Sequence, residues 1–306
     1  MTLSTESAAP GEGAPGTTSK PRGRNLAVAV PTALGLIALL LVSVWFSPWG
    51  FLALVCIALL LALRELCGAL EKAGFNVPYW PLAVGSVATQ VAAATSGPSS
   101  VVVGLFVTLA AATAWRALDF DFKPAPNSPD PDRPRRSAAQ DVYATAFATL
   151  YLPALAALVV LLSFMPDGRW LVLLLVAVPV ASDTGGYFAG SYLGKHKLAP
   201  HVSPKKTWEG LAGSILLASL AGVGGMLLMD RPWYYGLALA IFGSLAATLG
   251  DLAESLLKRS IGIKDMGSLL PGHGGVLDRV DSILMTAPFV YVVIVLAGAG
   301  VFDEIA

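Results

Sequence analysis

Charged residues are scarce in this sequence: only 13% of its 306 residues are Asp, Glu, Lys or Arg, whereas 55% are hydrophobic. Together with a mean hydropathy of +0.69, this scarcity excludes an ordinary soluble protein. Histidine is rare as well, with three residues, and no Ser-His-Asp arrangement is evident. No internal repeat is evident either, which argues against a transporter built from inverted repeats. The composition therefore indicates a polytopic membrane protein.

Cysteine is almost absent. The two cysteines, Cys56 and Cys67, fall eleven residues apart on one predicted helix. A helix separates them by about 16 Å along its axis, at about 1.5 Å per residue, which excludes a disulfide between them within that helix. We interpret both as buried thiols that pack as small hydrophobic side chains.

Long apolar runs dominate what is present. A helix needs about 20 apolar residues to cross the hydrocarbon core of a bilayer. Nine runs are candidates, at 26–46, 50–70, 79–96, 99–118, 139–163, 170–190, 209–229, 233–254 and 281–301. The third is the weakest, because it is short and contains Gln90; if it does not span, every later loop changes side. We therefore expect an all-α, polytopic transmembrane bundle of about nine spans.

The lysine and arginine residues indicate the orientation of these spans, because such residues concentrate in cytoplasmic loops. With nine spans and a cytoplasmic N-terminus, 18 of the 20 fall in inner segments or at inner helix ends, and only Arg169 and Arg231 fall outside. The polar segment at 255–281 then faces the cytoplasm. We expect a multi-pass protein of the plasma membrane.

Composition divides the chain into four regions. Residues 1–25 are rich in Ser, Thr, Gly and Pro and are expected to form a disordered cytoplasmic tail. The apolar run that follows is too long for a signal peptide and should remain as the first span of a four-span region, 26–118. Five prolines make 119–138 a flexible cytoplasmic loop. The five-span region 139–306 carries nearly all the remaining polar groups and is expected to be catalytic.

The segment from Ser255 to Asp281 concentrates charge and glycine between apolar stretches. If the eighth span continues as a helix, Asp251, Ser255 and Lys258 share one face, at i, i+4 and i+7. Asp278 and Asp281 lie at i and i+3 at the start of the ninth helix, where the helix dipole favours carboxylates. The two carboxylate sites could meet across the connecting loop, and such oxygen ligands suit Mg2+.

The loop between these helices has little side-chain bulk, since it contains Gly267, Pro271, Gly272, His273, Gly274 and Gly275. Backbone N–H groups in such a loop can approach an anion closely, so it could wrap a triphosphate. The alternative is a turn that merely joins two helices, but the flanking charges favour a binding loop.

Two further segments are candidates. Asp183 is an ionisable residue at membrane depth, which is costly and points to function; alternatively it caps a helix end or pairs with a lysine. Ser203, Lys205, Lys206 and Thr207 offer charge and hydroxyl groups to a phosphate, although they could be an ordinary positive flank. Near the end of the second span, Arg64 and Glu65 form an ion pair, or Arg64 meets a lipid headgroup; we favour a structural role.

The order S-x-L-K-R-x4-K-D-x-G-x2-L-P-x-H-G-G-x2-D-R-x-D at 255–281 resembles the signature of the phosphatidate cytidylyltransferases, integral membrane enzymes that make CDP-diacylglycerol. S-D-T-x-x-Y-x-x-G at 182–190 and S-P-K-K-T-W-E-G at 203–210 are similar to two other blocks of that family. The resemblance implies a homodimeric, mostly helical enzyme with a funnel open to cytoplasm and membrane. Its partners would be CTP, phosphatidate and membrane lipid, and no nucleic acid.

The resemblance also implies roles at matching positions. Asp251 and Asp278 would bind the metal, which is Mg2+, with a second cation left open. Asp265 and Asp281 are further acidic members, and His273 would shape the loop or contact phosphate. Phosphate contacts are implied for Ser255, Lys258, Arg259, Lys264 and Arg279. The remaining substrate-binding candidates are Asp183, Thr184, Ser203, Lys205, Lys206, Thr207, Gly274 and Gly275.

The implied reaction joins the phosphate of a lipid to the α-phosphorus of CTP and expels pyrophosphate. A phosphate monoester is largely dianionic at neutral pH, so it needs no strong general base. The site must instead neutralise charge and align two anions. Two alternatives remain open. A CTP-dependent lipid or polyprenol kinase would release CDP, and a transporter or channel would place its charge along a path across the bilayer.

Overall fold

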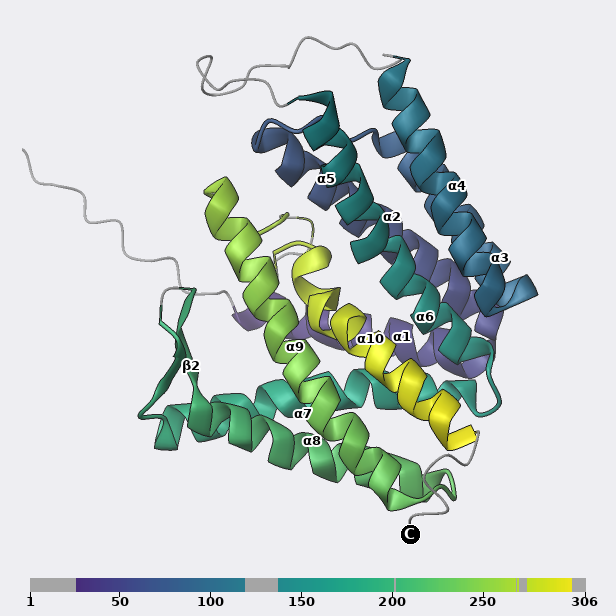
Figure 1. The fold of residues 1–306 in the computed structure, drawn as a ribbon. Helices are drawn as coiled ribbons and strands as arrows, with labels where there is room; N and C mark the ends of the chain where they lie inside the picture. The colour runs from purple at the N-terminus through teal and green to yellow at the C-terminus, as the bar shows by residue number, and fades with distance from the viewer. Residues whose placement is uncertain (1–25, 119–136, 201, 268, 270–273, 299–306) are drawn as a thin grey trace, which may run out of the picture.

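The computed structural model describes residues 26–118, 137–200, 202–267, 269 and 274–298. The described chain is almost entirely helical (Figure 1). Its helices are α1 (Leu26–Phe46), α2 (Pro48–Lys72), α3 (Tyr79–Ser96), α4 (Pro98–Ala117), α5 (Ala138–Tyr151), α6 (Pro153–Phe164), α7 (Gly168–Leu193), α8 (Trp208–Leu228), α9 (Trp233–Ile261) and α10 (Leu277–Gly298). The predicted all-α class is confirmed.

Seven helical stretches of the described chain are long and apolar enough to cross a membrane, with α5 and α6 together forming one of them, Ala138–Phe164. The first predicted span contains a shorter apolar helix, Val30–Phe46. The third predicted span, identified above as the weakest, coincides with α3 but is not among the seven. A multi-pass helical bundle is therefore present, while the count of nine spans and the cytoplasmic N-terminus stay predictions.

Local sequence signals set several helix boundaries. Proline occupies the first turn of α2, α4 and α6, where the missing N–H group costs nothing. Ser137 and Gln140 form a reciprocal capping box at the start of α5. Thr207 caps α8 by accepting a hydrogen bond from the Gly210 N–H. Helix α9 ends at Ile261, and Gly262, the residue that follows, has a φ of 80°, which favours glycine.

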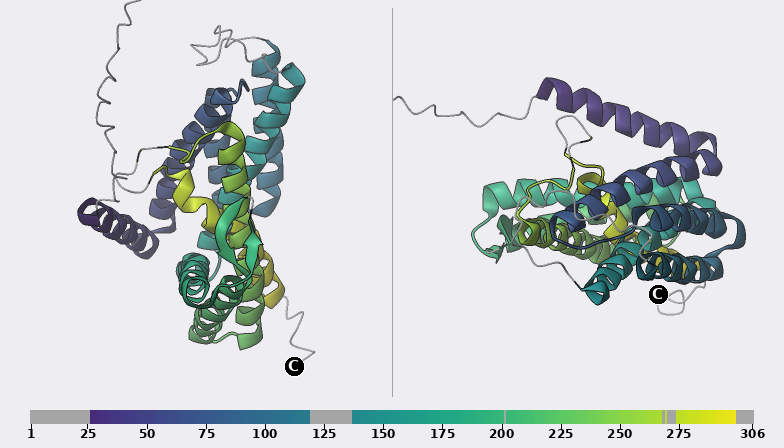
Figure 2. Two further views of the ribbon diagram at one scale, coloured as in Figure 1. Left: turned by 90° about the vertical axis from the view of Figure 1, so that its left-hand side faces the viewer. Right: turned by 90° about the horizontal axis from the view of Figure 1, so that it is seen from above.

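Glycines allow the C-terminal helices to pack closely. A Cβ atom on Gly185 of α7 would collide with the Gly213 carbonyl of α8, and one on Gly236 of α9 would collide with the Gly222 carbonyl of α8. Helix α10 lies beside α9 and also contacts α2, α6 and α7 (Figure 1). Helix α1 lies at the outer edge of the bundle (Figure 2). This packing brings the polar end of α9 next to the start of α10.

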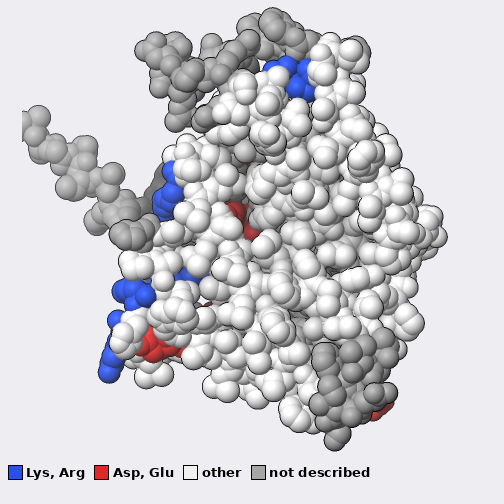
Figure 3. Space-filling view, in the orientation of Figure 1, with Lys and Arg blue, Asp and Glu red and all other residues white. Residues whose placement is uncertain are grey.

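A two-stranded antiparallel hairpin, which the sequence did not predict, precedes α8. Strand β1 (Lys197–Ala199) pairs with β2 (Ser203–Thr207), with Lys197 opposite Thr207 and Ala199 opposite Ser203. Figure 3 shows lysine and arginine side chains along the edge of the molecule where this hairpin lies, whereas most of the helical surface in that view is uncharged. The chain thus separates a charged edge from a surface suited to lipid.

Candidate functional site

Helix α9 continues beyond its apolar part to Ile261, as the polar face shared by Asp251 and Lys258 requires. Both residues line a cleft of about 370 Å³ between α7, α9 and α10. The acidic side chains that line this cleft are Asp183, Asp251, Glu254, Asp265, Asp278 and Asp281. Lys258 and Arg279 are the basic residues that line it. Six acidic residues against two cations leave an excess of negative charge that a bound cation would balance.

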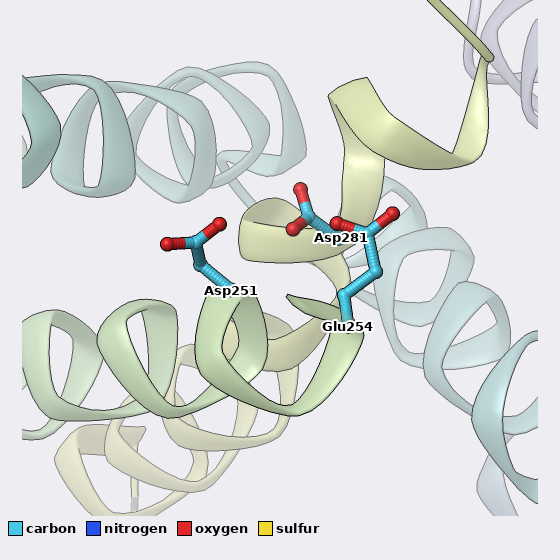
Figure 4. Close-up of side chains that lie close together, drawn as sticks. All are labelled: Asp251, Glu254 and Asp281. Carbon is cyan, nitrogen blue, oxygen red and sulfur yellow. The ribbon is translucent and has the colours of Figure 1, made fainter. Parts of the chain in front are cut away.

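Three of these carboxylates converge across the junction of α9 and α10 (Figure 4). Asp251 and Glu254 come from α9 and Asp281 from α10, and one oxygen of each lies within 4.8 Å of the others. Glu254 and Asp281 are only 3% and 5% exposed. Oε1 of Glu254 is buried and accepts no hydrogen bond within the described part of the chain. Carboxylates from the two sites that could meet across the loop, Asp251 and Asp281, do lie together in this structure.

Lys258 connects this cluster to Asp278. Its Nζ atom lies 3.0 Å from Glu254 Oε2 and 2.9 Å from Asp278 Oδ1. The other oxygen of Asp278 accepts hydrogen bonds from the backbone N–H groups of Met266 and Gly275, each at 2.9 Å. Asp278 therefore fastens both ends of the glycine-rich loop to α9 through Lys258. Its implied role as a metal ligand stays a prediction.

The hairpin reaches the same site through Lys206. Its Nζ atom lies 2.6 Å from Asp251 Oδ2 and 3.3 Å from the Thr248 carbonyl oxygen. Asp183 enters the cleft from α7, with an exposed side chain. Residues from three segments that are far apart in sequence, Asp183, Lys206 and Asp251, are thus brought together at this cleft.

Other predicted residues lie less directly at the cleft. Thr184 is exposed and donates a hydrogen bond to the Val180 carbonyl, while Thr207 serves as the cap of α8. Lys205 on β2 is exposed. Ser203, Ser255, Arg259 and Lys264 are not among the residues that line the cleft. His273 lies outside the described residues.

Gly274 has a φ of 83° and packs close to Asp278, which suits glycine. Its neighbour Gly275 is the residue that donates to Asp278, as described above.

Two acidic residues at the site were not identified from the sequence. Glu254 has a detectable signal, because it lies three residues after Asp251 and four before Lys258 on one helix. Glu65 lies on α2 and accepts hydrogen bonds from the backbone N–H groups of Val276 and Leu277. Neither alternative that the sequence offered for Arg64 and Glu65 indicated this contact, which spans more than 200 residues of sequence.

The fold and the site define a class: a multi-pass helical membrane protein with a polar cleft in which carboxylates outnumber basic side chains. The sequence matches the model of the cytidylyltransferase family over residues 27–297, and the chain belongs to that family. Over 285 residues it is 35% identical to the phosphatidate cytidylyltransferase of Mycobacterium bovis, covering 92% of each chain. It is 36% identical to the Mycobacterium leprae enzyme of the same name, covering 89% of this chain and 88% of the relative.

A Bacillus subtilis relative, also named phosphatidate cytidylyltransferase, is 47% identical over 118 residues, which cover 38% of this chain and 44% of the relative. Similarity to the mycobacterial proteins, in contrast, extends over most of the chain, including the N-terminal helices that carry little polar chemistry.

Proposed function

We propose that this protein is an integral membrane phosphatidate cytidylyltransferase, which converts phosphatidate and CTP to CDP-diacylglycerol and pyrophosphate. The observation that carries the proposal is the convergence of Asp251, Glu254 and Asp281 beside Lys258 in one cleft. Family membership and the names of relatives that match over most of the chain support it.

The donor set of the cleft fits Mg2+. Carboxylate oxygens are the ligands that Mg2+ favours, and the buried Oε1 of Glu254 accepts no hydrogen bond from the residues that the structure describes. Asp251, Glu254 and Asp281 would hold the ion, and Asp278 is the further ligand that the resemblance implies. When bound, the ion would neutralise charge on the triphosphate as pyrophosphate leaves.

The basic side chains have separate tasks in this proposal. Lys258 is held in place by two carboxylates, so its ammonium group is oriented before substrate arrives. Arg279 lines the cleft and offers a planar donor group to phosphate oxygens. Lys206 brings a third positive charge to the edge of the carboxylate cluster. Fixed cations of this kind stabilise charge that builds up on the leaving group.

In the reaction, an oxygen of the lipid phosphate forms a bond to the α-phosphorus of CTP. The bond from that phosphorus to the oxygen shared with the β-phosphorus breaks, and pyrophosphate takes the electron pair. The attacking phosphate is already largely dianionic, so none of the cleft residues needs to act as a strong base. The residues contribute by holding two mutually repelling anions in line.

The cytoplasmic orientation of the cleft is part of the proposal and rests on the distribution of Lys and Arg residues. The plasma membrane location and the homodimer rest on the family resemblance. Light scattering of the protein in detergent tests the homodimer, since the protein contribution to the mass should be twice that of one chain.

The position of a radioactive label distinguishes the proposed reaction from the kinase alternative. Purified protein is incubated with phosphatidate, Mg2+ and CTP labelled at either the α- or the γ-phosphorus. Cytidylyl transfer moves the α-label into the lipid and releases the γ-label as pyrophosphate. Transfer of the γ-label into lipid would identify a kinase, and solute flux in liposomes without CTP turnover would identify a transporter.

A further inference from the structure

Glu65 joins the N-terminal region of the protein to the start of α10. Its Oε1 atom accepts a hydrogen bond from the Val276 N–H at 3.1 Å, and Oε2 accepts one from the Leu277 N–H at 2.9 Å. These amides belong to the beginning of α10, where backbone N–H groups have no partner within the helix. A carboxylate there satisfies two donors and interacts favourably with the helix dipole.

Two glycines of the signature segment leave room for this carboxylate. A Cβ atom on Gly267 would collide with the carboxylate group of Glu65. A Cβ atom on Gly275 would lie 2.5 Å from Glu65 Oε2 and 2.8 Å from its Cδ. Both approaches are too short for a methyl group, so the two ends of the loop close around Glu65. Glycine is needed at positions 267 and 275 because the Glu65 side chain, about 200 positions away in sequence, occupies the space that a Cβ atom would take.

The start of α10, which Glu65 holds, also carries two acidic residues of the cleft, Asp278 and Asp281. Leu277 immediately precedes Asp278, which bonds to Lys258, and Asp281 follows one turn later in the carboxylate cluster. A shift of this turn would move both carboxylates relative to α9. We propose that Glu65 is a positioning residue for cytidylyl transfer: it fixes the start of α10 so that Asp278 and Asp281 face Lys258 and Glu254. This inference rests on the proposed function, and it gives the N-terminal region a part in the active site.

The substitution Glu65→Gln tests this inference, because it keeps the side-chain volume and replaces one acceptor oxygen with a donor. Glu71→Gln is the matched control, since Glu71 is exposed on the same helix, α2. Turnover is measured as a function of Mg2+ concentration, and Mn2+ binding without nucleotide is measured by electron paramagnetic resonance. Glu65→Gln should raise the half-saturating metal concentration about tenfold or more in both assays, as for lost outer-shell contacts at metal sites. Glu71→Gln should change neither.

A merely structural cap would behave differently. Glu65→Gln would then lower the yield of folded protein, while the folded fraction kept the wild-type metal dependence, and that result would overturn the proposal. Hydrogen exchange at the amides of Val276 and Leu277 provides a readout independent of activity, and it should become faster in Glu65→Gln. Unchanged exchange at both amides would also overturn the proposal.

Gly267→Ala, which leaves Glu65 intact, tests the same contact without relying on Glu65→Gln, and a double-mutant cycle extends it. Gly267→Ala alone should impair Mn2+ binding, because the added methyl group meets the Glu65 carboxylate. In a Glu65→Ala background the same change should cost much less, because the obstructing group is gone. Equal, additive effects would contradict the contact. If the wild-type protein binds Mn2+ but makes no CDP-lipid, the proposed function fails, while the exchange and binding measurements still decide the role of Glu65.

Discussion

Replacing Glu254 with glutamine removes one negative charge from the carboxylate cluster and leaves its volume almost unchanged. The side chain is 3% exposed, and one of its oxygens lies within 4.8 Å of oxygens from both Asp251 and Asp281. Its Oε2 atom accepts a hydrogen bond from Lys258, which would retain Asp278 as a partner in the variant. We therefore expect a folded protein with a weakened metal site.

The size of the effect follows from simple electrostatics. A divalent ion and a unit charge about 4 Å apart interact by about 8 kcal/mol at an effective dielectric constant of about 20, twice the value for two unit charges. The glutamine carbonyl still offers one oxygen, Lys258 already offsets part of the original charge, and water can take the place of the lost ligand, so we take about a quarter, roughly 2 kcal/mol. At about 1.4 kcal/mol per factor of ten, the half-saturating Mg2+ concentration should rise about thirtyfold.

The assay measures the initial rate of CDP-lipid formation across a series of Mg2+ concentrations. Asp167→Asn is the control, because Asp167 lies at the N-terminal end of α7, whereas the cleft lies near the C-terminal end of that helix. The Asp167 carboxylate is half-exposed and lies 3.6 Å from Arg231. High Mg2+ should restore much of the rate in Glu254→Gln. A wild-type Mg2+ curve for this variant would refute a metal-binding role for Glu254.

Three further predictions concern the cleft and its orientation. Asp278→Asn should lower turnover by about a hundredfold or more with the protein still folded, because it breaks charged hydrogen bonds worth about 1.5–3 kcal/mol each; near-normal turnover at limiting Mg2+ would remove Asp278 from the site. Lys258→Met should reduce kcat/KM for CDP-lipid formation by about ten- to a hundredfold, whereas Lys197→Met, at an exposed position of β1, should have little effect. Similar small losses from both variants would show that Lys258 is only one of the lysines that concentrate on the cytoplasmic side, with no part in the reaction. Cysteine introduced at Lys205 should react with a membrane-impermeant reagent from the cytoplasmic side of oriented vesicles, and labelling only from the other side would contradict the nine-span topology.

The core of the site could be predicted because it depends on short-range spacing. Asp251 and Lys258 share a face wherever α9 is helical, and Asp281 follows at the start of the next helix. Helices α9 and α10 are consecutive in the chain and pack against each other, so their carboxylates meet. Glu254 lies on the same side of α9 but at i+3 from Asp251, so the i, i+4 and i+7 positions of Asp251, Ser255 and Lys258 do not include it.

Long-range contacts could not be predicted from spacing. The bond from Glu65 to the start of α10 depends on how α2 packs against α10, and nothing in the local sequence around Glu65 indicates that packing. The hairpin at 197–207 was missed for another reason. Its strands are short and carry lysines, so they lack the alternating apolar pattern that indicates a strand.

The fate of the lipid phosphate oxygens tests cytidylyl transfer most directly. Phosphatidate with oxygen-18 at the three non-bridging oxygens of its phosphate is incubated with the protein, CTP and Mg2+. The oxygen-18 content of each product is then measured by mass spectrometry. Attack of the lipid phosphate on the α-phosphorus predicts CDP-diacylglycerol that retains all the oxygen-18, together with unlabelled pyrophosphate in equal amount. Release of CDP with a lipid diphosphate, or oxygen-18 in the pyrophosphate, would contradict it.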